Sequence, residues 1–340
     1  MSSVDMYVDG AVASTCATLV SNPFDVMRTR MQLQGELRKR GEYHMEYRNM
    51  PQGMIRVVRQ EGWKALFKGL PAAVLWQITQ NGIRIGLYPA VRAELSHVVG
   101  SDAMYVSVVA GATCGMVGAF VSSPFQMVKT RLQSQRGTMT TLHGHNLSTA
   151  TTGEQYDYTG VRDALRKIYK QGGIRDLWGG ANIAMQRTMV GSATQLTAYD
   201  VAKTNVCKVT GLAESDIRVH VCSALFSAIC IVIFMNPLDV VMTRSFNHRS
   251  GEPKVYSANL AAATWKVFRV EGFSGLYKGS MALFSRSAPH NIATFVSLEY
   301  LRKFRENYTN RSYTSGSKVD KSIGFRKFKE ELDATNESSV

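Results

Sequence analysis

A short phrase that begins with proline occurs three times in the chain, and this repetition restricts the possible folds more than any other feature. The copies read PFDVMRTR from Pro23, PFQMVKTR from Pro124 and PLDVVMTR from Pro237, and each closes a long apolar segment. Successive copies lie roughly 100 residues apart, which exceeds the length of a solenoid repeat and suits a module of two helices with a loop. The chain therefore uses one structural unit three times.

A second phrase follows each copy and ends in glycine. It reads EGWKALFKG up to Gly69, QGGIRDLWGG up to Gly180 and EGFSGLYKG up to Gly279. The extra length of the middle unit lies upstream of this phrase, in the polar stretch 134–157, which we expect to be a surface loop. The predicted organisation is three repeats and a polar, disordered tail: 1–100, 101–212, 213–305 and 306–340.

The composition narrows the class of partner. The chain carries 40 Lys+Arg against 26 Asp+Glu, a net charge of +14, which suits nucleic acid, anionic lipid or anionic solutes. No zinc-finger or RNA-binding phrase is present, which argues against nucleic acid. The sequence also contains no nucleophile–base phrase, metal-ligand spacing or phosphate-binding glycine loop. We therefore predict no catalytic residue, no metal site and no enzyme activity.

Six segments of near-membrane length have unusual polarity. Residues 219–235 are strongly apolar, whereas the other five mix apolar residues with Gly, Ser, Thr, Gln and Arg. This mixture suits helices that face lipid on one side and a polar cavity on the other. A soluble all-helical repeat protein is the alternative. We predict an all-α bundle of six transmembrane helices with pseudo-threefold symmetry; the five mixed segments are 6–20, 72–87, 105–121, 183–198 and 281–298.

The proline phrase also predicts contacts between repeats. A proline within a helix removes a backbone hydrogen bond and bends the helix, which brings the residues two and five positions later toward the common axis. Charges at this depth are costly unless they are paired. An acid of one repeat that pairs with the base of the next gives three predicted contacts: Asp25 with Lys129, Asp239 with Arg28, and Gln126 with Met242.

The departures from the phrase support this pairing. Gln126 stands where the other copies have an acid, and Met242 stands where they have a base. Both departures fall on the same predicted contact. A buried charge without its partner costs several kcal/mol, so the joint loss of both charges is what pairing predicts. We expect a lock of two ion pairs and one neutral contact.

The two phrases resemble the signatures of the mitochondrial carrier family, Pro-x-[Asp/Glu]-x-x-[Lys/Arg]-x-[Arg/Gln] and [Asp/Glu]-Gly-x4-aromatic-[Lys/Arg]-Gly, over roughly residues 6–305. The resemblance implies a monomeric multi-pass protein of the mitochondrial inner membrane, with both termini toward the intermembrane space. It implies six transmembrane helices around a central cavity, three short helices on the matrix side and alternating access. The proline-phrase contacts would then form the matrix gate.

The family's second gate uses the phrase [Phe/Tyr]-[Asp/Glu]-x-x-[Lys/Arg] on the even helices. Here Tyr199 begins a full match, Leu298 begins a match without the aromatic residue, and the copy at Tyr88 has lost its acid. Two acids against three bases allow at most two pairs. The resemblance thus implies an incomplete cytoplasmic-side gate: Arg92, Asp200, Lys203, Glu299 and Arg302.

The repeat also predicts a solute site. Seven residues beyond each closing glycine lie Trp76, Arg187 and Arg286, at one depth on the three even helices. Two arginines at this depth make an anion site, because the planar guanidinium holds a carboxylate or sulfate by two bonds. The alternative is that the arginines pair with acids elsewhere in the bundle. The absence of Asp and Glu from residues 70–87, 183–198 and 280–297 argues against it.

Further polar residues extend this site. Arg84 shares one helix face with Trp76 and Gln80, and either steers anions or is a spare charge near the gate. His290 either couples proton movement to anion uptake or is a neutral histidine bonded to the helix backbone or Asn291. Gln77 adds a donor and an acceptor, and Arg187 followed by Thr188 resembles the contact of keto-acid and dicarboxylate carriers.

Three local phrases resemble the oxaloacetate-carrier branch of the family, which includes orphan animal carriers. They are NGIRIG from Asn81, MVGSATQL from Met189 and RSAPHN from Arg286. This likeness implies exchange of oxaloacetate, malonate-like or isopropylmalate-like dicarboxylates, with sulfate or thiosulfate as partners. An uncoupler-like proton or anion leak and a membrane scaffold without transport are the alternatives.

Lipid contacts are predicted at the closing glycines. The FKG and YKG turns place a base and free backbone N–H groups at a helix start, which suits the phosphate of a lipid such as cardiolipin, whereas WGG lacks the base. We expect no other cofactor. The predicted lipid-binding residues are Lys68, Gly69, Gly180, Lys278 and Gly279.

Overall fold

The computed structural model describes residues 3–39, 41–100, 104–136, 153–210, 217–249, 251 and 255–301, apart from 288, 291, 295 and 298. The regular elements of these residues are helices, which confirms the predicted all-α fold. The predicted tail 306–340 and most of the predicted loop 134–157 lie outside the described residues. The elements are α1 (Ser3–Leu33), α2 (Met50–Glu61), the 3-10 helix η1 (Trp63–Phe67), α3 (Leu70–Val99), α4 (Met104–Ser134), α5 (Val161–Asp176), α6 (Ala181–Thr210), α7 (Ile217–Phe246) and α8 (Leu260–Leu276).

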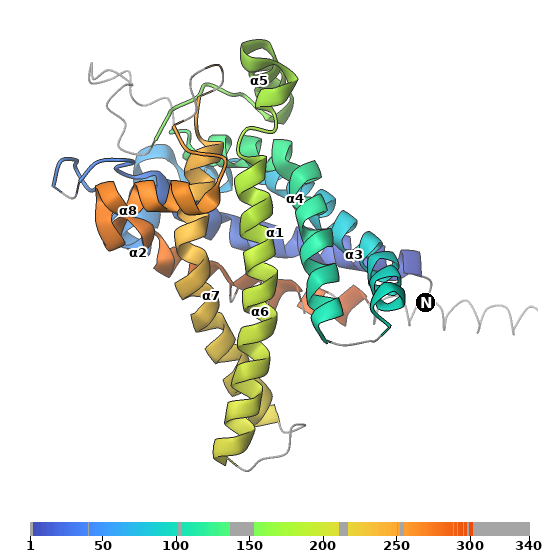
Figure 1. Ribbon diagram of the computed structural model, residues 1–340. Helices are drawn as coiled ribbons and strands as arrows, with labels where there is room; N and C mark the ends of the chain where they lie inside the picture. Colours follow the sequence, from blue (N-terminus) through green and yellow to red (C-terminus); the bar gives the residue numbers. More distant parts are fainter. Residues whose placement is uncertain are drawn as a thin grey trace, which may run out of the picture.

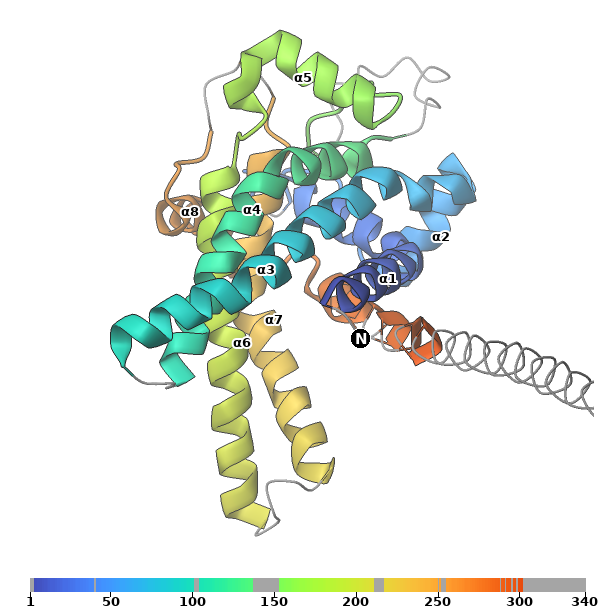
Figure 2. The same cartoon turned by 90° about the vertical axis from the view of Figure 1, so that its right-hand side faces the viewer.

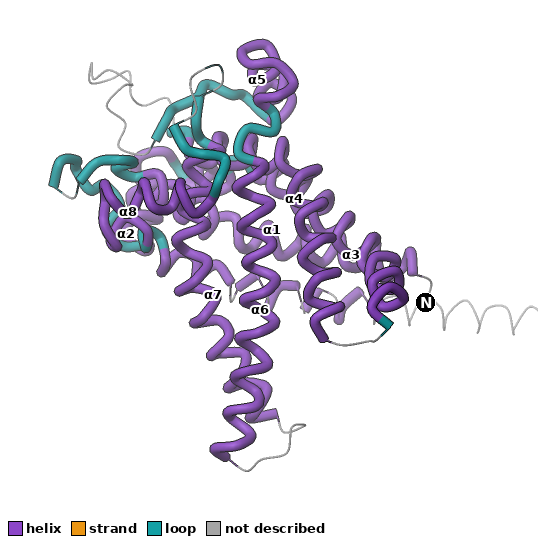
Figure 3. Tube along the Cα trace, in the orientation of Figure 1, coloured by secondary structure: helices purple, strands orange, loops and turns teal. Residues whose placement is uncertain are grey.

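The order of a long, a short and a long helix occurs three times, because the described residues of 280–301 are again helical. Figure 1 shows that the short helices α2, α5 and α8 lie around one end of the bundle. From that end the hairpin of α3 and α4 and the hairpin of α6 and α7 run in different directions (Figures 1 and 2). The long helices therefore converge at the end that carries the short ones and spread at the other (Figure 3).

Two of the described helices are long and apolar enough to cross a membrane by the usual test of length and hydropathy. These spans are Tyr105–Ser134 in α4 and Ile229–Phe246 in α7. The remaining long helices carry polar residues along much of their length, as expected for helices that border a polar cavity. Pro23, Pro124 and Pro237 lie inside α1, α4 and α7, each of which continues through its proline.

The convergent ends are joined by a ring of three arginines. Arg30, Arg131 and Arg244 close the three proline phrases and are almost completely buried. The last carbonyls of a helix have no partner within the helix and carry partial negative charge, so they suit a guanidinium. Each arginine Nε donates to a carbonyl at the end of the next helix, 3.1 Å away: Arg30 to Gln133, Arg131 to Phe246, and Arg244 to Gln32.

Two glutamates complete this arginine ring. Arg244 donates to both carboxylate oxygens of Glu271, at 2.6 and 3.0 Å, and Lys278 binds the same carboxylate at 2.6 Å. Burial by itself raises the pKa of Glu271, but the hydrogen bonds and charges of the two bases outweigh it and leave the pKa below its usual value. Arg30, Glu61 and Lys68 form the same arrangement in the first repeat.

The Arg244–Glu271 pair supplies a test of the ring. We expect Arg244→Gln to lower the free energy of unfolding by about 3 kcal/mol, because a buried carboxylate loses its bidentate partner. Denaturant unfolding of the purified protein in detergent measures this change. Lys167→Gln serves as the control, since the contacts of Lys167 with Asp163 and with the carbonyl of Asp157 lie at the surface and should contribute little to stability. Equal stability of the Arg244 variant and the control would show that the ring contributes little.

Candidate functional site

All three predicted proline-phrase contacts are present where α1, α4 and α7 converge. Lys129 Nζ lies 2.9 Å from Asp25 Oδ2, and Arg28 lies 2.5 Å from Asp239 Oδ2. The neutral contact joins the amide nitrogen of Gln126 to the sulfur of Met242 at 3.4 Å. Both aspartates are buried. The pairing inferred from the repeated phrase therefore agrees with the geometry, whereas its gating role stays a prediction.

The two arginines of the predicted anion site pair with the same aspartates. Arg187 Nε lies 2.6 Å from Asp239 Oδ1, and Arg286 Nε forms an ion pair with Asp25 Oδ1. The expectation that these arginines lack acidic partners is wrong. It considered acids on the even helices only, whereas the partners lie on α1 and α7.

Each aspartate consequently lies between two bases. Four bases and two acids meet here, so this group carries a net charge of +2. We call it the central cluster; its members are Asp25, Arg28, Lys129, Arg187, Asp239 and Arg286. An excess of buried positive charge attracts an anion, because partial burial reduces screening by water.

Trp76 adjoins the central cluster. Its ring lies 4.6 Å from Lys129 Nζ, within cation–π range. Its indole nitrogen is buried and has no hydrogen-bond partner among the described residues. The three positions found by counting from the closing glycines therefore meet at one level, and the indole N–H is available as a further donor.

Other predicted contact residues lie at helix interfaces. Gln80 accepts a hydrogen bond of 2.6 Å from Ser122 of α4, and the hydroxyl of Thr188 donates to the carbonyl of Ala184 in its own helix at 2.8 Å. The methyl group of Thr188 packs against Gly115, where an added Cβ would lie only 2.9 Å away. Both side chains thus hold α3 and α6 against α4, and an added role in binding solute stays a prediction.

The last three predicted contact residues are His290, Arg84 and Gln77. His290 Nδ1 lies 3.1 Å from the hydroxyl of Ser21 in α1, within hydrogen-bond distance. Arg84 is exposed, and Gln77 is half-buried. Proton coupling through His290 stays a prediction.

The predicted cytoplasmic-side gate is only partly described. Arg92 and Glu299 are exposed, and Lys203 is half-buried on α6. The side chain of Asp200 and the whole of Arg302 lie outside the description. Because the hairpins diverge at this end (Figure 2), the conformation does not test pairing there.

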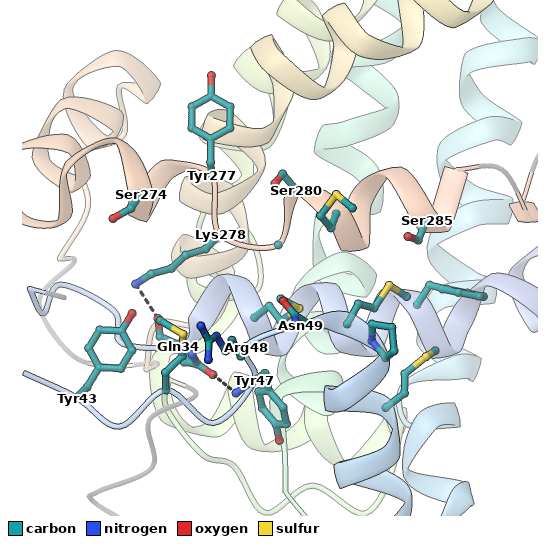
Figure 4. A pocket seen from close by; sticks show the side chains of 18 residues that line it. Gln34, Tyr43, Tyr47, Arg48, Asn49, Ser274, Tyr277, Lys278, Ser280 and Ser285 are labelled. Carbon is teal, nitrogen blue, oxygen red and sulfur yellow. Dashed lines mark hydrogen bonds between the residues drawn. The ribbon is translucent and has the colours of Figure 1, made fainter. Parts of the chain in front are cut away.

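The predicted lipid-binding turn before residues 280–301 borders a pocket of about 850 Å³ (Figure 4). The pocket also receives residues of α1 and of the loop and first turn of α2, among them Met31, Met45, Met50 and Met54. Flexible thioether side chains suit an acyl chain of variable shape. Gly279 has a φ of 78°, which favours glycine at this turn.

The lysines of the predicted lipid site are engaged within the protein. Lys278 Nζ donates to the carbonyls of Gln34 and Gly35, at 2.9 and 3.2 Å, in addition to its pair with Glu271. Lys68 Nζ binds Glu61 and the carbonyl of Gln135, both at 3.0 Å. The three N–H groups of Lys278 are thus engaged within the protein, which contradicts its availability for a phosphate in this conformation, whereas binding of lipid at Lys68 stays a prediction.

An exposed base in the pocket was missed by sequence reasoning. Arg48 lines the pocket beside Asn49, the N-cap residue of α2, whose side chain makes no hydrogen bond to the helix. Its exposed guanidinium suits an anionic headgroup. Arg48 lies outside both repeated phrases, so comparison of the repeats carried no signal for it.

Comparison with known proteins supports the resemblance over the whole helical part. The family model described as "Mitochondrial carrier protein" matches residues 1–98, 100–209 and 214–309. Solute carrier family 25 member 35 of Mus musculus is 35% identical over 310 residues, which cover 90% of this chain and 99% of the relative. The mitochondrial oxaloacetate transport protein of Saccharomyces cerevisiae is 35% identical over 304 residues, covering 87% and 88%. The mitochondrial citrate transporter E of Aspergillus niger is 32% identical over 309 residues, covering 90% and 94%.

The neutral contact between Gln126 and Met242 allows a test of gating. The double variant Gln126→Asp with Met242→Lys should complete a third ion pair and slow solute exchange in liposomes about fivefold, since the closed state gains about 1 kcal/mol. Each single variant should lower the thermal unfolding temperature, because it buries an unpaired charge. Met242→Leu preserves the volume and is the neutral control. A double variant that exchanges solute at the rate of the unmodified protein would contradict the gating role.

Proposed function

The chain belongs to the mitochondrial carrier family, and on that premise we propose that it exchanges small dianions across the mitochondrial inner membrane by alternating access. The observation that carries the proposal is the net charge of +2 in the central cluster, where Arg187 and Arg286 converge from two even helices. Dicarboxylates and keto acids such as oxaloacetate, malonate or isopropylmalate have the complementary charge. Sulfate and thiosulfate are further dianions that suit guanidinium groups.

The relatives support carboxylates as the solute class. Two of them are named as transporters of oxaloacetate and of citrate. Both solutes carry several carboxylates, and arginine binds carboxylates through a planar pair of hydrogen bonds. The protein performs no chemistry on the solute in this proposal; it provides an anion site that faces one compartment at a time.

The conformation suits one stage of this cycle. The proline-phrase contacts are formed at the end that carries the short helices, and the hairpins diverge at the other end (Figure 2). We assign the closed end to the matrix and the spread end to the intermembrane space, with both termini on that second side. Breaking the two ion pairs and the Gln126–Met242 contact would then admit the solute to the matrix.

The bound lipid and the oligomeric state belong to the same proposal. The methionine-lined pocket beside Gly279 and Arg48 suits an anionic lipid such as cardiolipin. The central cluster is assembled from the helices of one chain, which supports a functional monomer.

Liposome exchange tests the proposed function. Uptake of labelled malonate or oxaloacetate should require an internal dicarboxylate, and Arg187→Gln or Arg286→Gln should each reduce it about tenfold or more, because a charge-assisted contact is lost. Arg175→Gln, in an exposed position on α5, is the matched control and should retain full exchange. Collapse of a pH gradient without internal solute would indicate a leak. Absence of transport, with Arg187 and Arg286 both replaceable, would indicate a scaffold.

Thermal unfolding with added lipid tests the pocket. Cardiolipin should raise the unfolding temperature of the purified protein, and Arg48→Gln should reduce this rise, because the exposed base near the headgroup is lost. Lys278→Gln should lower the unfolding temperature with and without lipid, since Lys278 holds Glu271 and two carbonyls. An undiminished lipid effect in the Arg48 variant would exclude Arg48 as a headgroup contact.

A further inference from the structure

In each aspartate of the central cluster, the two carboxylate oxygens contact different bases. In Asp25, Oδ2 binds the base Lys129 of the next repeat, while Oδ1 binds Arg286. In Asp239, Oδ2 binds Arg28 and Oδ1 binds Arg187. One oxygen of each carboxylate thus belongs to a proline-phrase contact, and the other occupies an arginine of the anion site.

An entering solute would meet the arginines before the aspartates. The side chains of Arg187 and Arg286 are 29% and 18% exposed, whereas those of their partners, Asp239 and Asp25, are 0% and 4% exposed. The arginines therefore present a free surface while the carboxylates lie behind them. A solute carboxylate can approach either guanidinium without prior movement of a helix.

A solute carboxylate that binds a guanidinium side-on competes with the aspartate for the Nε–H group. Arg187 engages Asp239 through Nε, and Arg286 engages Asp25 through Nε. A side-on bidentate contact with a solute uses Nε–H together with one Nη–H, so it requires release of the aspartate oxygen from Nε. A released oxygen in a desolvated site loses a strong contact, which weakens the hold on that aspartate.

The net charge of the central cluster indicates how many carboxylates a matching solute carries. The four bases and two acids of the central cluster have a net charge of +2. A bound dianion brings the number of acidic groups to four, equal to the number of bases. A monoanion would release one aspartate and leave one excess charge. Closing the spread end over uncompensated charge is costly, which disfavours reorientation of the empty protein.

We propose that Asp25 and Asp239 are internal competitors of the transported solute: they occupy Arg286 and Arg187 in the empty carrier, and a dianion displaces both. This inference rests on the proposed dianion exchange and specifies how the solute loosens the matrix gate. Binding leaves each aspartate with one basic partner instead of two, so the gate is weakened only when both arginines are engaged. Solutes with two anionic groups meet that condition.

A double-mutant cycle tests the competition. Asp25→Asn should tighten malonate binding about tenfold when Arg286 is present, because the arginine no longer holds a charged competitor. The same substitution should change binding less than about twofold in an Arg286→Gln background. In an Arg187→Gln background the tenfold gain should persist, since Asp25 does not contact Arg187. Calorimetry with protein in lipid nanodiscs measures these affinities.

The cross-background comparison excludes a general electrostatic effect. Loss of a negative charge near a cavity favours anion binding in every background, so equal gains with Arg286→Gln and Arg187→Gln would overturn the proposal. Lys129→Met is the matched gate control, because it breaks the contact of Asp25 with Lys129 but leaves Asp25 on Arg286. It should not tighten malonate binding. Tighter binding in this variant would assign the effect to gate opening and overturn the competition.

The second aspartate provides an independent measurement. Asp239→Asn should behave in the same way with the roles of the two arginines exchanged, and it replaces the Asp25 cycle if that variant does not fold. An unmodified protein that binds and exchanges malonate, with no pair-specific gain in either cycle, would overturn this inference alone. An unmodified protein that neither binds nor exchanges any dicarboxylate would overturn the proposed function and this inference with it.

Discussion

The structure depends on two buried carboxylates that each bind two bases. Asp25 and Asp239 would be costly at the centre of a helical bundle without partners, and their bases come from other helices. Neutralising them therefore requires α1, α4 and α7 to converge and draws the first part of α6 and of residues 280–301 toward the same point. The proline-phrase contacts and the residues of the proposed anion site consequently form one charge network. Changes at either part alter the electrostatics of the other.

The three interfaces between repeats are not equivalent, and their differences follow one rule. In the first and third repeats a glutamate holds an arginine and a lysine: Glu61 with Arg30 and Lys68, and Glu271 with Arg244 and Lys278. The middle repeat has Gln171 in place of the acid and Gly179 in place of the lysine. Arg131 remains and uses the hydroxyl of Tyr158 and the carbonyl of His248, at 3.3 and 2.6 Å. The acid and its second base were lost together, as were the charges at Gln126 and Met242.

Repetition made much of this arrangement predictable. Aligning the three copies gave the helix order, the pairs across the axis and the common depth of Trp76, Arg187 and Arg286. Alignment of the repeats does not show which neighbouring helix packs over a position, so Gln80 and Thr188 were expected in the cavity and lie against α4. Alignment of the repeats also does not show which of several possible partners a charged side chain binds. The arginines were therefore expected to be unpaired, and Lys278 was expected to be available for lipid.

The arginine ring has a consequence for how such a chain tolerates mutation. Each arginine binds a backbone carbonyl, so this contact does not depend on the side chain at the receiving position, which is glutamine at 32 and 133 but phenylalanine at 246. The receiving residue lies at the same distance beyond the proline in all three helices. One inserted or deleted residue would move the carbonyl about 1.5 Å along the axis and about a quarter turn around it. The ring therefore fixes the length of each helix beyond its proline, and it is intolerant of insertions and deletions there, whereas substitutions at these positions act only through the contacts of the buried side chains.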